Sequence, residues 1–354
     1  MSARLRPLAQ LSVITLFALG APAAQAATVE VSEAFDESGT LVQLIYSAAP
    51  GEANRLTLSQ GTPVGAVRRI IVRDSGAPVT AKDGCTATGP GEAVCRMPVG
   101  TFDNVIEAGL GDGDDSADAR SVRSAKPGLE GGTGSDRLTG SRSRPSVLFG
   151  DTIAGLPAGG SDVLVGGRRN DFLLGGPADD MLDGRGGRDE ASYFDETSRV
   201  FASLVRGRAE APAHTDSLKS IESLEGGDGG DRLVGDRRAN TLTGEGGKDE
   251  LLGNAGDDRL VGGAGGNLFT GGGLEDDTMI GGLGDDALLG ERGRDRMFGG
   301  RGRDRLAAGR GRDELFAGPG NDRVNSRDGR RDRVRCGVGS DVVRSDALDV
   351  LFGC

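Results

Sequence analysis

Histidine and aromatic residues are scarce in this chain of 354 residues, which has one His, no Trp, two Tyr and 11 Phe. A single His excludes zinc sites built on several His side chains and leaves little for His-based acid–base catalysis. Large rings dominate the burial energy of ordinary cores, so their scarcity argues against a conventional core. We expect one elongated arrangement that packs small residues repetitively.

Positive charge is also in deficit, because 42 Lys and Arg stand against 54 Asp and Glu, for a formal net charge of −12. Affinity for nucleic acid comes from neutralising phosphates, so this acidic chain is predicted to bind cations and no nucleic acid. Glycine, in contrast, is abundant: the 63 Gly are more than twice the usual share of ~7%. With only 13 Pro, the composition is not that of collagen.

Residues 1–26 have the pattern of an export signal. Arg4 and Arg6 supply positive charge, Leu8 to Leu19 is apolar, and Ala24-Gln25-Ala26 fits the small-x-small cleavage rule. The apolar stretch is too short to span a bilayer, which needs about 20 residues, and no later stretch is longer. We predict a signal peptide, a mature chain from Ala27, no membrane span, and an extracellular or cell-surface location.

Four cysteines suit an exported protein and fall as two local pairs, Cys85 with Cys95 and Cys336 with Cys354. Three connectivities are possible for four Cys, and the local pairing is the simplest. A metal site is the rival reading, but the four show no C-x-x-C spacing. Local disulfides would close short loops near the two ends of the mature chain.

A nine-residue unit recurs through most of the chain: two Gly, any residue, Gly, any residue, Asp, and then a short apolar-centred segment. Full matches of the first six positions are Gly131–Asp136, Gly226–Asp231, Gly281–Asp286 and Gly299–Asp304. In one block the acid keeps this period at Asp162, Asp171, Asp180 and Asp189. In the next block it keeps the period, with two one-residue slips, at Asp231, Asn240, Asp249, Asp258, Asn267, Asp277, Asp286, Asp295, Asp304, Asp313, Asp322, Asp332 and Asp341. An apolar residue follows each acid two positions later, from Leu164 to Val343.

The pattern of the unit predicts its local structure. Glycine tolerates positive φ, so the G-G-x-G stretch predicts a tight turn. The three residues after the acid predict a short strand whose central side chain points inward. Two units complete one coil, so residues eighteen apart stack on neighbouring rungs and the apolar residues form a thin core. A helix is excluded, because Gly at this density costs about 1 kcal/mol per position. The predicted fold is all-β: a parallel β-roll, or β-solenoid, with a β-rich N-terminal segment.

Two parts of the mature chain lack the repeat. The N-terminal part holds strand-like runs at Thr28–Ser32, Leu41–Ser47, Arg55–Ser59, Arg69–Arg73 and Cys85–Cys95. It is expected to cap the coil or to form a small domain of its own.

The second is an insertion, in which Val200–Val205 and Leu218–Leu224 are interpreted as longer rungs around an Ala/Pro-containing loop. His214 lies in that loop and is expected at the surface.

The predicted organisation is a signal peptide (1–26), a β-rich N-terminal segment or cap (27–108), a first repeat block (109–192), an inserted segment (193–225), a second repeat block (226–344) and a C-terminal cap closed by a disulfide (345–354).

The nonapeptide G-G-x-G-x-D-x-U-x, with U apolar, resembles the RTX, or haemolysin-type calcium-binding, repeat. The resemblance covers roughly residues 109–344. It implies a parallel β-roll with several Ca²⁺ ions between stacked turns, held by repeat Asp carboxylates and turn carbonyls. Ca²⁺ takes six to eight oxygen ligands of these kinds, and without it stacked carboxylates would repel.

Carried onto this sequence, the resemblance assigns calcium ligation to Asp136, Asp162, Asp171, Asp180, Asp189, Asp231, Asp249, Asp258, Asp277, Asp286, Asp295, Asp304, Asp313, Asp322, Asp332 and Asp341. It implies two columns, one from Asp231 through Asp249 to Asp341 and one from Asn240 through Asp258 to Asp332. In the earlier block it pairs Asp162 with Asp180 and Asp171 with Asp189.

The sequence departs from the family pattern in two ways. Asn240 and Asn267 offer neutral oxygens, so their sites should be weaker or empty, and Arg169, Ala178 and Leu274 replace the fourth-position Gly. Arginine is also frequent beside the acids, at Arg294, Arg296, Arg303, Arg305 and Arg312. These side chains either pair with the Asp carboxylates in place of an ion or are simply solvated.

No catalytic motif accompanies the repeats: H-E-x-x-H, G-x-S-x-G and the phosphate-binding loop are all missing. The sequence therefore predicts a secreted, non-enzymatic calcium-binding protein whose repeats order when they meet calcium outside the cell. Two alternatives stay open, a secreted hydrolase with an RTX tail and a metal-independent β-solenoid that acts in adhesion at a cell surface. The sequence names no partner other than calcium ions.

Overall fold

The computed structural model describes residues 26–36, 39–64, 67–98, 104–151, 159–271 and 274–354. The predicted signal peptide lies outside these residues, except for Ala26. Every regular element in the described part is a β-strand, and no helix there is long and apolar enough to cross a membrane. The chain divides into two compact units, Met1–Asp171 and Phe172–Cys354.

Two sheets build the first unit. In spatial order, one contains β5 (Val79–Ala81), β1 (Ala27–Asp36), β2 (Gly39–Ser47), β8 (Asn104–Gly109), β10 (Ala125–Glu130) and β12 (Val147–Phe149). The other contains β6 (Cys85–Gly89), β7 (Glu92–Pro98), β4 (Val67–Asp74), β3 (Arg55–Gln60), β9 (Ser116–Ser121), β11 (Arg137–Thr139) and β13 (Val163–Val165).

The N-terminal strands join the first coils directly. β2 pairs in parallel with β8, and β3 pairs in parallel with β9, so both sheets of the coil continue into the N-terminal part. Beyond these strands the pairing becomes antiparallel, as in β1 with β2 and β3 with β4. Within this unit the β-rich segment therefore covers the end of the coil.

The strand-like run Cys85–Cys95 is a hairpin rather than one strand, because the chain turns at Pro90–Gly91 between β6 and β7. Cys85 and Cys95 face each other across this hairpin and form one disulfide. Cys336 and Cys354 form the other, which confirms the local pairing.

Two sheets also build the second unit. In spatial order, one contains β14 (Phe172–Leu174), β16 (Glu190–Ser192), β20 (Ser223–Glu225), β22 (Thr241–Thr243), β24 (Arg259–Ala264), β26 (Thr278–Leu283), β29 (Arg296–Arg301), β32 (Glu314–Phe316), β34 (Arg333–Arg335) and β36 (Val350–Phe352).

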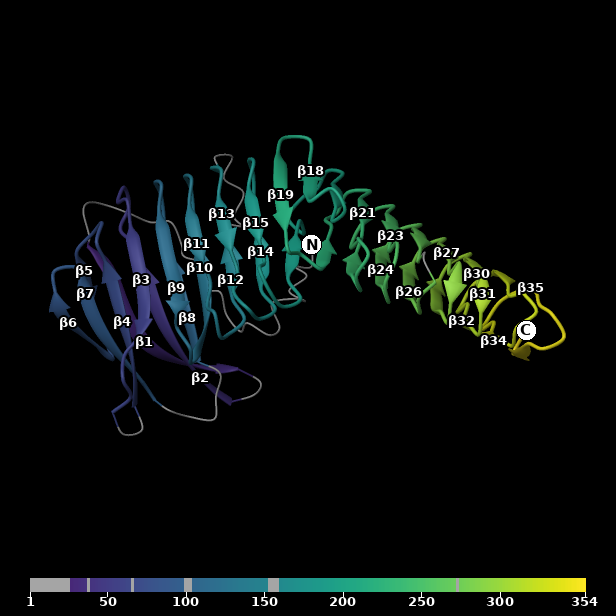
Figure 1. Ribbon diagram of the computed structural model, residues 1–354, viewed down its shortest axis with the longest axis horizontal. Coiled ribbons are helices and arrows are strands. Elements are labelled where there is room, and N and C mark those ends of the chain that lie inside the picture. Colours follow the sequence, from purple (N-terminus) through teal and green to yellow (C-terminus); the bar gives the residue numbers. More distant parts are fainter. Residues whose placement is uncertain (1–25, 37–38, 65–66, 99–103, 152–158, 272–273) are drawn as a thin grey trace. The chain divides into compact units, whose positions relative to one another are not determined.

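The other sheet of this unit contains β15 (Met181–Asp183), β19 (Thr215–Lys219), β18 (Arg208–Glu210), β17 (Phe201–Ser203), β21 (Arg232–Val234), β23 (Glu250–Leu252), β25 (Leu268–Thr270), β27 (Ala287–Leu289), β30 (Arg305–Ala307), β33 (Arg323–Asn325) and β35 (Val342–Arg344). A short pair, β28 (Arg292–Gly293) with β31 (Arg310–Gly311), lies in the turns. Figure 1 shows the coils succeeding one another from β21 to β35, green to yellow.

Successive coils stack in the predicted register. Leu233 pairs with Leu251, and Leu251 with Phe269, each eighteen residues further along. The predicted ladder of apolar side chains is buried, at most 2% exposed, from Leu164 to Val334. Val343, in the last strand of its sheet, is only half-buried, because no further coil covers it.

In many units the turn has left-handed backbone at its second or fourth position, or at both. In the unit that starts at Gly281, Gly282 has φ 111° and Gly284 has φ 119°, a region that Gly enters without steric cost. Glu245, in a second position, accepts φ 69°, and Ala178, in a fourth position, accepts φ 92°. The turn conformation is therefore set by the coil, and most but not all units have Gly where it is required.

The insertion folds as an antiparallel meander inside one sheet. β17 pairs with β18 and β18 with β19, both antiparallel, while β15–β19 and β17–β21 keep the parallel order of the roll. The expectation of longer rungs is wrong, because Val200–Val205 yields only the three-residue β17, and Leu218–Leu224 bends at Ser220 (φ 52°) between β19 and β20.

Candidate metal centre

The acids of the repeat stack into two columns along the second unit. In each step the backbone N–H of one acidic position donates a hydrogen bond to the side-chain Oδ1 of the acidic position one coil further on. For example, Asp286 N–H donates to Asp304 Oδ1 over 2.9 Å, and Asp277 N–H donates to Asp295 Oδ1 over 2.9 Å. The separations are eighteen or nineteen residues, except for seventeen in the last step of the second column, and the two predicted slips fall within these columns.

The first column runs through Asp231, Asp249, Asn267, Asp286, Asp304, Asp322 and Asp341. The second runs through Asn240, Asp258, Asp277, Asp295, Asp313, Asp332 and Asp349. This confirms the predicted stacking and adds Asp349 to it.

The second carboxylate oxygen of most column acids has no hydrogen-bond donor within the described chain, although it is buried. These Oδ2 atoms belong to Asp249, Asp258, Asp277, Asp286, Asp295, Asp304, Asp313, Asp322 and Asp332, and the same holds for Asp136 in the first unit. A buried carboxylate oxygen without a donor is costly, so most such groups are satisfied by a donor, a water or an ion. A row of such oxygens is a row of positions where a cation would be favourable.

Carbonyl oxygens lie beside these orphan atoms at the first Gly of the turn. A Cβ atom on Gly281 would lie 2.4 Å from Asp286 Oδ2 and 2.2 Å from the carbonyl oxygen of Gly299, one coil on. On Gly299, a Cβ would lie 2.5 Å from both Asp304 Oδ2 and the carbonyl oxygen of Ala317. The missing side chain lets a carboxylate oxygen and a backbone oxygen approach the same point, and both are ligand types that Ca²⁺ prefers.

The side chains alone do not make a closed cage. Within the described residues, no group of three or more His, Cys, Asp or Glu converges on one point. Since each turn supplies one column carboxylate, the remaining oxygens would have to come from turn carbonyls. This donor set fits a hard cation such as Ca²⁺ and does not fit zinc.

Burial raises the pKa of the column acids above the usual value for Asp. The pKa is raised to about 7 for Asp249, Asp258, Asp277, Asp286, Asp295 and Asp313, to about 6 for Asp304 and Asp332, and, in the first unit, to about 6 for Asp136. The backbone N–H bond to Oδ1 opposes this effect, and neighbouring carboxylates add to it. The columns therefore hold charge at neutral pH only against a desolvation penalty, which a bound cation would offset.

Other predicted ligands have different surroundings. Asp231 Oδ2 accepts from Gly227 N–H (2.8 Å), and Asp171 Oδ2 accepts from Gly167 N–H (2.5 Å). Asp162, Asp180 and Asp189 are buried, with the pKa of Asp162 raised to about 8 by burial. Their pairings Asp162–Asp180 and Asp171–Asp189 run from one compact unit to the other and stay predictions.

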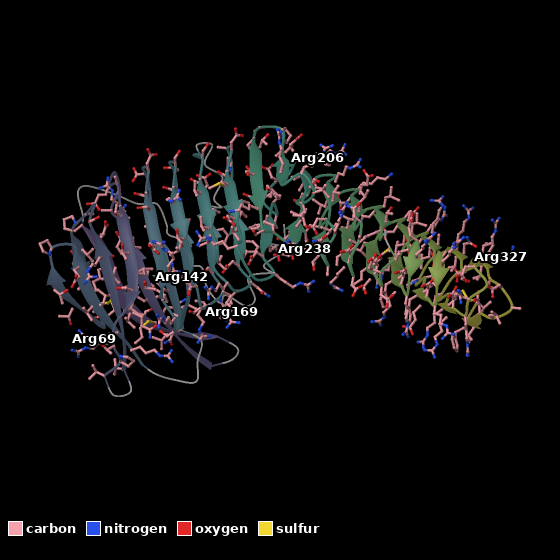
Figure 2. The ribbon with its side chains drawn as sticks, viewed as in Figure 1. Arg69, Arg142, Arg169, Arg206, Arg238 and Arg327 are labelled. Carbon is pink, nitrogen blue, oxygen red and sulfur yellow. A yellow bond between two sulfur atoms is a disulfide. The ribbon has the colours of Figure 1, made fainter. Side chains whose placement is uncertain are left out.

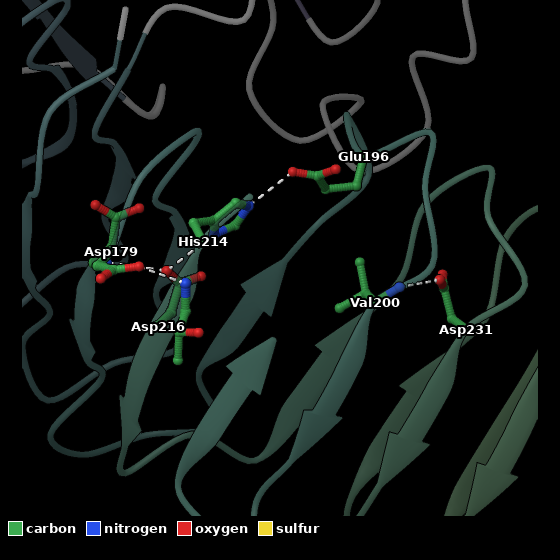
Figure 3. A network of polar contacts seen from close by, with 8 residues as sticks. Asp179, Glu196, Val200, His214, Asp216 and Asp231 are labelled. Atoms are coloured by element: carbon green, nitrogen blue, oxygen red, sulfur yellow. Dashed lines mark hydrogen bonds and ion pairs between the residues drawn. The ribbon is translucent and has the colours of Figure 1, made fainter. Parts of the chain in front are cut away.

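The insertion contains a different arrangement, built around His214. Its Nε2 lies 2.9 Å from Glu196 Oε1 and its Nδ1 lies 3.3 Å from Asp216 Oδ1 (Figure 3). The expectation of a surface histidine is wrong, since His214 is only 6% exposed. The loop folds against the roll because Thr215 N–H donates to Asp179 Oδ1 over 2.6 Å. The hydrogen bond to Asp216, opposed by burial and reinforced by Glu196, raises the pKa of His214 to about 9.

Asp216 continues the acid stacking across the insertion. Asp180 N–H donates to Asp216 Oδ1 over 3.0 Å, in the same way that the column acids are linked. Beyond the meander, Val200 N–H donates to Asp231 Oδ1 over 2.8 Å (Figure 3). At this coil the stacked carboxylate therefore has a cation of the protein itself, His214, beside it.

Sequence reasoning missed four acids in such positions: Asp115, Asp216, Glu222 and Asp349, each of which accepts a backbone N–H from another coil. All four stand two residues before an apolar residue that enters a strand (Ala117, Leu218, Leu224 and Leu351). The acid-x-apolar half of the repeat would have found them without the glycines.

The structure shows the surroundings of two departures from the family pattern, the Asn residues and the arginines beside the acids. Asn267 points a buried Nδ2 with no acceptor to where its neighbours have Oδ2. A donor there weakens that position for a cation. The five arginines beside the acids form no ion pair with a column carboxylate in the described structure; Arg296 instead pairs with Glu314. They do not replace an ion in the columns.

Comparison with known families agrees with this geometry. The family model of the RTX calcium-binding nonapeptide repeat (four copies) matches residues 158–191, 225–260, 252–273, 271–306 and 298–331. Residues 158–191 and 225–331 therefore match RTX calcium-binding nonapeptide repeats, and the all-β parallel roll is the fold expected of such repeats. No curated protein matches the chain.

Proposed function

We propose that this protein is exported and binds several Ca²⁺ ions between its stacked turns, that these ions stabilise the roll, and that it has no catalytic activity. The observation that carries the proposal is the row of buried Asp Oδ2 atoms without donors, next to turn carbonyl oxygens. The two disulfides are consistent with an oxidising location.

The residues of the chain would have separate tasks in this function. Oδ1 of each column acid accepts the N–H of the coil before it and so holds the register between coils. Oδ2 and the carbonyl oxygens at the first Gly would hold the ion. When bound, Ca²⁺ supplies positive charge that offsets the burial of the carboxylates.

Folding and binding would be coupled through this arrangement. A ligand that binds only the folded state stabilises it in proportion to the logarithm of its concentration. The repeats are therefore expected to stay disordered where calcium is scarce, as in a cytoplasm, and to order outside the cell. The buried, charged columns support this proposal because they oppose folding in the absence of a cation.

The lone histidine supports a non-enzymatic role, because both its ring nitrogens lie against carboxylates and its exposure is small. A metal-independent solenoid is the second candidate. It is favoured by the N–H to Oδ1 bonds and the buried ladder, which join the coils without any ion.

The test is far-UV circular dichroism of the chain from Ala27 onward, stripped of calcium and then titrated with Ca²⁺, with Mg²⁺ as the control. A cooperative gain of β-sheet signal with Ca²⁺ and not with Mg²⁺ is expected. A full β-sheet spectrum in the calcium-stripped protein at pH 8 would contradict calcium-coupled folding and favour the metal-independent solenoid.

A further inference from the structure

The last coils of the roll carry their arginines outside and much of their acid inside. From residue 290 to the C-terminus the sequence has fifteen Arg and eleven Asp or Glu, and every one of these Arg is exposed. Five of the acids, Asp295, Asp304, Asp313, Asp322 and Asp332, are column residues at most 1% exposed. Figure 2 shows arginine side chains projecting from this green-to-yellow part, with Arg327 labelled. This segment of an otherwise acidic chain therefore has a basic surface.

The arginines gather most densely on one edge, where the turns that precede the second column lie. The residues that form this basic edge are Arg292, Arg294, Arg310, Arg312, Arg330 and Arg331, two from each of three successive coils. β28 and β31 place Arg292 directly beside Arg310 in parallel register. Neighbouring rungs of a sheet lie about 4.8 Å apart, so the edge presents pairs of guanidinium groups at a regular short spacing.

None of these six guanidinium groups has an ion-pair partner in the described part of the chain. Two of the acids nearby are engaged by the backbone: Asp328 accepts from Gly311 N–H (2.9 Å) and Arg330 N–H (2.6 Å), and Asp276 accepts from Arg294 N–H (2.7 Å). Glu291, in the same turn as Arg292, is exposed and forms no ion pair in the described residues. Like charges on adjacent rungs destabilise a sheet. The row of unpaired arginines therefore does not stabilise the fold by itself. A bound anion would relieve the repulsion between these arginines.

The opposite edge differs. Its turns supply Arg301 and Arg303 in one coil, but the equivalent positions of the next two coils are Pro319 with Asn321 and Val338 with Ser340. The continuous row of arginines is therefore confined to one edge.

We propose that the basic edge binds a linear anionic polysaccharide whose sulfate or carboxylate groups repeat along the chain. Guanidinium groups bind such groups bidentately, and a periodic row of them matches a periodic polyanion better than a single compact ligand. Single-stranded nucleic acid is the less favoured polyanion, because its binding sites combine cations with aromatic stacking platforms, and no aromatic residue stands among residues 290–294, 309–312 and 328–331.

The test uses the purified protein in millimolar Ca²⁺ with dextran sulfate as the probe, neutral dextran as the ligand control, and isothermal titration calorimetry as the readout. The variant is Arg310→Gln with Arg312→Gln. Its matched control is Arg301→Gln with Arg303→Gln, which makes the same charge change at the same two turn positions on the opposite edge. Circular dichroism in Ca²⁺ checks that both variants fold.

We expect dextran sulfate to bind with an affinity that falls as salt rises, the basic-edge variant to bind about tenfold more weakly, and the control variant to stay within about twofold of the parent. An equal loss in both variants would overturn the assignment to this edge. Absence of binding, or tighter binding of a single-stranded DNA of equal charge at the same salt, would overturn the proposal of a polysaccharide ligand.

Discussion

The regular coils and the insertion meet the same electrostatic problem in different ways. In the regular coils, Asp277, Asp286 and Asp295 are buried with Oδ2 lacking a donor, and they form no ion pair within the described residues. In the insertion, Asp216 occupies an equivalent stacked position, and the buried His214 lies against it and against Glu196. Under the proposed function, one region would draw a cation or a proton from solution, whereas the other has His214 beside its stacked acid.

The comparison shows which charge the chain itself supplies where the nine-residue repeat is interrupted. The insertion adds β18 and β19 to one sheet, so Asp216 stacks next to the turn that ends at Asp180 but does not itself follow a glycine turn of the repeat. A protonated His214 offsets part of the charge of Asp216, although Asp216 Oδ2 still lacks a donor. The two regions should therefore respond differently to calcium and alike to acid.

The largest effect is expected from pH in the calcium-stripped protein. The pKa of six column acids is raised by burial to about 7 in the folded state, against about 3.9 when unfolded. The folded state therefore binds more protons, so stability is full at low pH and is lost as pH rises through about 7. Each group contributes on the order of 1–3 kcal/mol.

Circular dichroism of the calcium-stripped protein should accordingly show more β-sheet at pH 5 than at pH 8, and saturating Ca²⁺ should flatten this dependence. A β-sheet signal that falls toward pH 5 would show that the columns are not buried in the way described.

The second effect concerns the insertion. Replacing His214→Gln removes the buried cation between Asp216 and Glu196, and removing one partner of a buried ion pair costs about 3–5 kcal/mol. Chemical unfolding should show this loss with and without Ca²⁺ below pH 8. Since the pKa of His214 is raised to about 9, its stabilisation is full below pH 6.5 and disappears as pH rises through 9. A loss that added Ca²⁺ restores would mean that the insertion also binds the ion.

The third effect concerns the regular coils, where one substitution should raise stability without calcium and lower the affinity for calcium. Asp286→Asn keeps an oxygen for Asn267 N–H but removes the buried charge. It is expected to stabilise the calcium-stripped protein by about 1–3 kcal/mol at pH 8 and to weaken Ca²⁺ binding. Asp285→Asn is the matched control, because Asp285 precedes it and is exposed. Equal behaviour of the two variants in a calcium titration would contradict ligation by Asp286.

The smallest effect is expected at the surface of the same coils. Glu314→Gln breaks the ion pairs of Glu314 with Arg296 (3.5 Å) and Arg333 (3.4 Å), both arginines being exposed. Such pairs contribute about 0–1 kcal/mol each. The midpoint of thermal unfolding in Ca²⁺ should hardly move, and a shift as large as that of His214→Gln would place the stability of the roll in its surface charges.

The site was predictable where the pattern is periodic. Spacing alone placed Asp286 above Asp304 and Leu251 beside Phe269, because a nine-residue turn-strand unit allows only one stacking once two units form a coil. Prediction failed where the period stops. Asp216, Glu222 and Asp349 lack the glycines of the repeat, and His214, flanked by Ala and Pro, looked like a surface residue.

The sequence by itself determined the β-roll, its core ladder and the identity of the stacked acids, since each follows from local turn preferences repeated at a constant period. Tertiary structure alone decided which charges are buried and which are exposed. The acids lie inside because their Oδ1 atoms accept N–H groups from the neighbouring coil, while the arginines at adjacent positions alternate outward along turns and strands. Burial depends on which coil lies next to a residue, and neither net charge nor composition contains that information.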